Sequence, residues 1–154
     1  MPRTSKTHSF LLALAASGCL LCSATPAAHG GRELVVIVHK QSPATTLSAA
    51  QVKQYYLKQQ GEWSDGSKVR PVQQQGDVRD GFLKRALGMS NTDFERYWLE
   101  RKYSAAESPP KQVDTDDDVI RFVGAMKGAI GFVDASSLDP TSLGKVKAVL
   151  KTTY

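Results

Sequence analysis

Cysteine is nearly absent from this chain of 154 residues, which has only Cys19 and Cys22, both close to the N-terminus. A chain that loses this first segment on export carries no disulfide and no thiol nucleophile. The scarcity of cysteine therefore excludes a disulfide-rich scaffold and a cysteine enzyme. The stability of the folded part has to come from a packed core, and the remaining length suffices for one domain.

Acidic residues are missing from the N-terminal segment, whereas Arg3 and Lys6 precede the apolar run Phe10–Cys22. A positive start, a short apolar core and a following stretch of small residues are typical of a signal peptide. The apolar run is too short to favour a transmembrane helix. We therefore predict a cleaved signal peptide over residues 1–28 and a single periplasmic domain over residues 29–154.

A lipoprotein signal is the alternative interpretation of the same segment. The sequence Ala16–Cys19 could serve as a cleavage box with Cys19 lipidated. It lacks the usual leucine three residues before the cysteine, and cleavage there would leave Leu20 and Leu21 on the mature chain. The soluble, exported form is therefore the preferred interpretation.

Enzyme signatures are also missing, because the chain has no Walker sequence, no HExxH motif and no nucleophile elbow. We predict that the protein is not an enzyme and uses no cofactor. The formal net charge is +5, but lysine and arginine do not cluster, so nucleic acid is not an expected partner. The acidic run over residues 114–118 lacks the glycine and the distal glutamate of a calcium loop, so no metal site is predicted.

Strands and helices alternate along the predicted domain. Strands are expected at 33–39, 69–72, 129–133 and 145–150, and helices at 48–61, 77–88, 90–101 and 119–128, with an extended loop at 103–112. The first strand is apolar throughout, which is typical of a strand covered by helices on both faces. We therefore predict an α/β fold: a single three-layer lobe with a mostly parallel or mixed sheet of about four or five strands, flanked by helices.

The stretch Lys68–Leu87 is the centre of this pattern. A short strand is followed by three glutamines and Gly76, and then by a helix for which Asp77 is the expected N-cap. A strand, a polar loop and a helix N-terminus in this order favour anion binding, because unpaired N–H groups and the helix dipole point into the loop.

Several segments together resemble the phosphate-type periplasmic substrate-binding proteins of ABC transporters. They are LVVIVHKQSPATTLSAAQVKQYYL, EWSDGSKVRPV, FLKRALGMSNTDFERYW and GAIGFV, and they span roughly residues 33–150. Their order and spacing are similar to those of one lobe of that class II periplasmic-binding fold. The resemblance implies an exported domain that binds a small oxyanion, most simply phosphate, and is associated with phosphate uptake.

The resemblance also implies a ligand site in the central loop and the first helical turn. The predicted ligand-binding residues are Gln74, Gln75, Gly76, Asp77, Val78, Arg79, Ser42 and Thr45. This chain departs from the family in having Gln74 in place of an arginine, and residues 78–80 in place of a Ser-Gly-Thr run. Arg79 is the favoured anion contact, since its guanidinium suits a bidentate oxyanion. The alternative is a solvated Arg79 paired with Asp77 or Asp80.

A single lobe offers only one wall of the two-walled site of a full-length binding protein. A homodimer with two such loops facing each other would rebuild the second wall. Alternatively, the lobe is a ligand-free protein-interaction module that partners a membrane sensor, a transporter or an envelope complex. The sequence leaves these two functions open.

Overall fold

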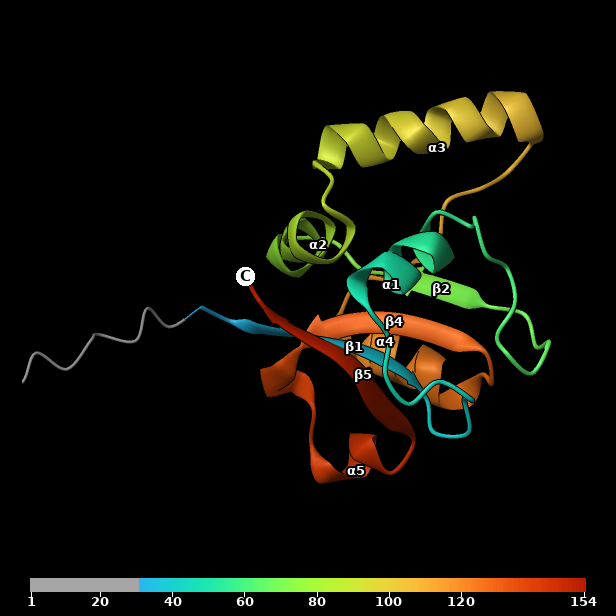
Figure 1. Cartoon of the computed structure of the whole chain (residues 1–154). Helices are drawn as coiled ribbons and strands as arrows, with labels where there is room; N and C mark the ends of the chain where they lie inside the picture. The colour runs from blue at the N-terminus through green and yellow to red at the C-terminus, as the bar shows by residue number, and fades with distance from the viewer. Residues whose placement is uncertain (1–30) are drawn as a thin grey trace, which may run out of the picture.

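The computed structural model describes residues 31–154, so the predicted signal peptide and Cys19 lie outside the described residues. The sheet has the order β3-β2-β4-β1-β5, and Figure 1 labels β2, β4, β1 and β5. Its strands are β1 (Glu33–His39), β2 (Arg70–Gln73), β3 (Lys111–Gln112), β4 (Ala129–Asp134) and β5 (Val146–Thr153). Strand β2 is parallel to β3 and β4, whereas β1 is antiparallel to both β4 and β5. The predicted mixed sheet is confirmed.

Helices lie on both faces of this sheet (Figure 1). They are α1 (Ala49–Tyr56), α2 (Asp77–Phe82), α3 (Asn91–Ala105), α4 (Asp116–Ala125) and α5 (Pro140–Leu143). Helices α1 and α2 contribute to the core on one face, and α4 contributes to the core on the other. The predicted three-layer lobe is therefore confirmed. Over residues 31–154, no helix combines the length and the apolar character needed to cross a membrane.

Strand β1 separates the two cores, as its apolar sequence predicts. Leu34, Val36 and Val38 belong to the core under α1 and α2. Val35 and Ile37 belong to the core under α4. Successive side chains of a strand point to opposite faces, so five consecutive apolar residues supply both cores at once.

Aromatic packing fixes α2 on the sheet. The rings of Phe82 in α2 and Phe132 in β4 stack with centroids 3.9 Å apart and planes inclined by 6°. Tyr56 lies 4.6 Å from Phe82, centroid to centroid, and its hydroxyl donates to the Val72 carbonyl at 2.8 Å. The helix that follows the central loop is thus anchored to β4, and this anchor sets where the loop lies.

Helix boundaries differ from the predictions at four places. Helix α4 runs over Asp116–Ala125 instead of 119–128, because Thr115 caps it earlier in the acidic run. Gly76, with φ 78°, is the N-cap of α2, and Asp77 is the first helical residue instead of the cap. Helix α1 stops at Tyr56, well before Gly61, because Lys58 turns into the left-handed region with φ 52°. Helix α3 runs on to Ala105, into the predicted loop, since no proline interrupts it before Pro109. Downstream of Phe82, the chain of α2 continues into a wider π-helical turn over Leu83–Leu87.

Gly131 provides a test of the packing between β4 and α4. A Cβ at this position would lie 2.5 Å from Val119 Cγ1 and 3.0 Å from Val72 Cγ1. We expect Gly131→Ala to lower the free energy of unfolding by about 1–3 kcal/mol through overpacking, as measured by urea denaturation. Gly61→Ala is the control, because nothing lies within 4 Å of its added Cβ. Equal midpoints for the two variants would contradict this account of the core.

Candidate functional site

The candidate site lies at the edge of the sheet where β2 and β4 end. These two strands are parallel, so their carboxyl ends meet there, and β1 begins at the same edge because it is antiparallel to β4. Ligands of open α/β sheets bind outside the carboxyl ends of the strands. We call this region the polar edge and define it by Arg32, Gln74, Asp77, Asp116, Asp134 and Tyr154.

Gln74 ties the end of β2 to its neighbours. Its side-chain amide donates to the Phe132 carbonyl at 3.1 Å and to the carboxylate of Asp116. The residue is only 4% exposed. Its neighbour Gln73 is also buried, and its amide is 3.4 Å from the Pro110 carbonyl. Two of the three consecutive glutamines, one ending β2 and the next beginning the loop, are therefore hydrogen-bonded inside the fold, and Gln75 alone is exposed.

Asp116, the first residue of α4, links this helix to the end of β4. Its Oδ2 accepts from the Asp134 N–H at 3.1 Å and from the Ser137 hydroxyl at 2.6 Å. A carboxylate in the first turn also interacts favourably with the helix dipole. The acidic run that could suggest a metal loop thus serves partly as a structural junction. Within residues 31–154, no three His, Cys, Asp or Glu side chains are grouped as metal ligands.

Asp134 is the hub of the polar edge, and its side chain is only 8% exposed. One oxygen accepts from the Ser136 N–H at 2.9 Å and the Ser136 hydroxyl at 2.6 Å. The other accepts from Arg32 Nε at 2.8 Å and the Tyr154 hydroxyl at 3.0 Å. These hydrogen bonds, above all that of the Ser136 hydroxyl, lower the pKa of Asp134 to about 2. Burial, together with the bond to Asp134, raises the pKa of Tyr154 to about 12.

The start of α2 is open at this edge. In the described part of the chain, α2 is the one α-helix without a side-chain cap. A Cβ added at its N-cap, Gly76, would have no atom within 4 Å. The first N–H groups of a helix have no partner within the helix, so those of α2 are available to an acceptor. Asp77 and Asp80 are exposed beside them and carry negative charge.

Arg79 turns away from this opening toward α3. Its Nη1 donates to Asn91 Oδ1 at 2.5 Å, and its guanidinium lies over the Phe94 ring, 5.5 Å from the centroid. Oε1 of Glu95, also in α3, lies 4.0 Å from Arg79 Nη2. Only 15% of the side chain is exposed. Arg79 therefore fastens α3 to α2, and it forms no ion pair with Asp77 or Asp80 among the described residues. Val78 is also buried, in the core under α2.

Ser42 and Thr45 lie at the opposite end of the sheet from the central loop. They follow β1, which runs antiparallel to β4, so the loop after β1 lies near the beginning of β4. Ser42 is buried there, and its carbonyl accepts from Lys147 Nζ at 2.7 Å. The structure does not bring these two residues together with residues 74–79.

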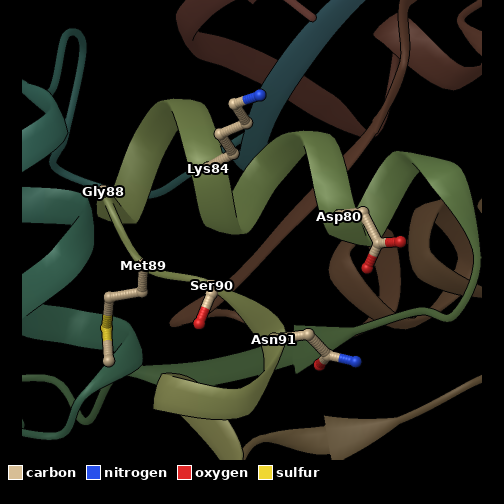
Figure 2. Close-up of a pocket in the computed structure, with 6 residues that line it drawn as sticks. All are labelled: Asp80, Lys84, Gly88, Met89, Ser90 and Asn91. Atoms are coloured by element: carbon tan, nitrogen blue, oxygen red, sulfur yellow. The ribbon is translucent and has the colours of Figure 1, made fainter.

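Two open hollows flank α2. One, of about 540 Å³, lies between α2 with its π-helical turn and the start of α3, and is lined by Asp80, Lys84, Gly88, Met89, Ser90 and Asn91. Figure 2 shows Asp80 and Asn91 at one end of this hollow and Met89 toward the other. The second, of about 270 Å³, adjoins the polar edge, and Asp77, Gly81 and Tyr154 contribute to its lining.

Sequence reasoning missed Arg32, Asp116, Asp134 and Tyr154, which the fold brings together. Asp134 is the last residue of the buried strand β4, and a polar residue at the carboxyl end of such a strand is a usable signal. Arg32 and Tyr154 give no such signal, because Arg32 meets Asp134 across 102 positions of the sequence.

No protein-family model matches the chain, and no curated protein matches it either. Solved structures do match, and three of the matches are the following. An ABC-type phosphate transport receptor from Vibrio cholerae is 22% identical with a TM-score of 0.58, over 77% of this chain and 45% of that one. A putative phosphate ABC transporter substrate-binding protein from Clostridium perfringens, solved with bound phosphate, is 21% identical with a TM-score of 0.59. The match covers 77% of this chain and 45% of that one. PstS from Borrelia burgdorferi is 10% identical with a TM-score of 0.60, and the match covers 77% of this chain and 47% of that one.

The chain therefore spans less than half the length of the proteins that it matches. It has the fold of one lobe of a phosphate-type substrate-binding protein, so the resemblance read from the sequence is confirmed for the fold. At these identities the likeness concerns the fold alone.

The hub at Asp134 predicts a specific loss of stability in acid. Its folded pKa of about 2 lies below the ordinary 3.8, so the stabilisation is complete above about pH 4 and is lost as the pH falls toward 2. We expect the loss to be about 2 kcal/mol, and we expect Asp134→Asn to remove this part of the pH dependence. Urea denaturation from pH 6 to pH 2 measures it. Asp114→Asn, an exposed carboxyl, is the control; identical acid profiles for the wild type and Asp134→Asn would contradict the role of the hub.

Proposed function

We propose that this protein is an exported, single-lobe relative of binding proteins that takes a small oxyanion, phosphate first, at the polar edge, in association with phosphate uptake. One observation carries the proposal: 77% of the chain matches one lobe of phosphate receptors, including one solved with bound phosphate. Those neighbours are transport receptors and substrate-binding proteins, which favours a binding role over catalysis.

The geometry of α2 supports an anion at this edge. The uncapped first turn provides N–H donors, and Gln75 is exposed beside them. In this proposal the oxyanion contacts Gln75, Gly76, Asp77 and the backbone of Val78. Gln74 orients the loop from behind, since its amide is already bound to Phe132 and Asp116.

The same edge limits the affinity. Asp77 can accept a hydrogen bond from a protonated phosphate, but it repels a fully ionised oxyanion. One wall also leaves much of the ligand in water, whereas tight sites bury most of the ligand surface. We therefore expect a dissociation constant near 1 mM, which is about −4 kcal/mol.

Phosphate titration of residues 29–154, followed by backbone NMR shifts at constant ionic strength, tests the proposal. We expect saturable shifts at Gly76–Val78, and we expect Asp77→Asn to tighten binding about threefold by removing a like charge. Glu100→Gln removes the same charge from an exposed position of α3 and is the control. Arg79→Ala is expected to lower stability with little change in affinity, because its guanidinium lies on α3. No saturable shift with tens of millimolar phosphate would refute the binding function.

Export is tested by the mass of the protein isolated from the envelope of a bacterial host. Cleavage after Ala28 predicts a soluble periplasmic chain that begins at His29. A lipidated chain that begins at Cys19 and fractionates with membranes would instead establish the lipoprotein alternative. Cytoplasmic protein that retains residues 1–28 would refute export.

A protein-interaction module remains the second candidate function, and α3 provides the observation that favours it. Leu99 and Tyr103 lie four residues apart on this helix and are 54% and 80% exposed. Exposed apolar side chains on one helix face are a common feature of docking surfaces. The envisaged partner is a membrane sensor, a transporter or an envelope complex, and a negative phosphate titration would favour it.

A further inference from the structure

Arg32 is the cation among the residues that define the polar edge, and only one of its three guanidinium nitrogens is hydrogen-bonded within the described part of the chain. Its Nε donates to Asp134 at 2.8 Å, while 54% of the side chain stays exposed. Among residues 31–154, its two terminal nitrogens form no hydrogen bond. A guanidinium bound through Nε keeps this terminal pair of donors free, and such a pair matches two oxygens of an oxyanion.

Two neighbours hold this guanidinium in place. Asp134 is itself fixed by the N–H and hydroxyl of Ser136, so it cannot easily rotate away from Arg32. The ring of Tyr154 lies under the guanidinium, whose central carbon is 5.4 Å from the ring centroid. An arginine held by a carboxylate and by an aromatic ring has already lost much of its rotamer freedom.

Tyr154 also connects Arg32 to α2. Its ring packs so closely on Gly81 that a Cβ there would lie 2.3 Å from the ring. Asp77, at the start of α2, and Tyr154 line the same hollow of about 270 Å³, and the Arg32 guanidinium lies over the Tyr154 ring. Arg32 is therefore placed beside the loop from which the proposed ligand contacts come.

We infer that Arg32 is the cationic side chain that contacts the oxyanion, and that Asp134 and Tyr154 are positioning residues that aim its two terminal nitrogens outward. This inference rests on the proposed function. It assigns the positive charge of the site to Arg32, the residue just before β1, instead of Arg79, which the sequence favoured.

Phosphate titrations of the wild type, Arg32→Ala, Arg32→Lys and Arg70→Ala test the inference by the NMR shifts of Gly76–Val78. Arg70→Ala is the matched control, since it removes an equal charge from an exposed residue at the start of β2, the opposite end of the sheet. We expect Arg32→Ala to weaken binding at least tenfold and Arg70→Ala to change it less than twofold. Arg32→Lys should recover only part of the loss, because an ammonium cannot bind Asp134 and two ligand oxygens in the same planar arrangement.

Tyr154→Phe tests the positioning role separately. It keeps the ring under Arg32 but removes the hydroxyl that binds Asp134, and we expect phosphate binding to weaken two- to threefold. Urea denaturation of each variant shows whether a weaker affinity merely reflects unfolding.

The outcomes separate the inference from the proposed function. If the wild type does not bind phosphate, both are refuted. If the wild type binds and Arg32→Ala binds equally well, the inference alone is refuted. If Arg32→Ala and Arg70→Ala weaken binding to the same extent, the affinity depends only on the net charge of the protein, and the inference is again refuted.

Discussion

The carboxylate of Asp134 is the interaction on which the polar edge depends. It is nearly buried, and it remains ionised because donors from Ser136, Arg32 and Tyr154 surround both of its oxygens. These donors come from the turn after β4, the residue before β1 and the residue after β5. Burying a charge is unfavourable unless it is fully hydrogen-bonded, so the carboxylate requires all three segments to meet at one point. The geometry of the candidate site follows from that requirement.

The electrostatics of this edge differ from those of a strong anion site. Asp77 and Asp116 add further carboxylates, whereas Arg32 is the one cation in the group that defines the edge. The field at the open turn of α2 is therefore the sum of a favourable helix end, the cations Arg32, Lys84 and Arg85, and the unfavourable nearby acids. Such a balance favours ligands that carry both negative charge and a proton to donate. It also makes the effect of ionic strength on binding smaller than a cluster of arginines would produce.

The sequence predicted those parts of the fold that depend on local pattern. The five apolar residues of β1 predicted a strand covered on both faces, and the helix expected from residue 48 begins at Ala49, with Ser48 and Gln51 forming a capping box at its start. It could not predict the direction of β1. Because that strand is antiparallel to β4, Ser42 and Thr45 fall at the far end of the sheet from the central loop.

Side-chain direction was the other limit of sequence reasoning. Arg79 is close to the loop along the chain, but its long side chain reaches Asn91 and Phe94. Arg32, Asp134 and Tyr154 come from three distant parts of the sequence, and only the pairing of β1 with β4 and β5 brings them together. Contacts of this kind depend on tertiary structure and cannot be predicted from residue spacing in the sequence.

The adjacency of Arg32 and Tyr154 has a mechanical consequence. The Tyr154 N–H donates to the Arg32 carbonyl at 3.0 Å, and the two strands that these residues flank run antiparallel (Figure 1). A force that separates the two residues would break the hydrogen bonds between β1 and β5 one after another, starting from this end. The lobe would therefore yield to tension at these points more easily than a domain in which the same strands are sheared along their length. Because β1 begins beside the end of β5, both strands can also be joined to a second domain at neighbouring points without distortion of either strand.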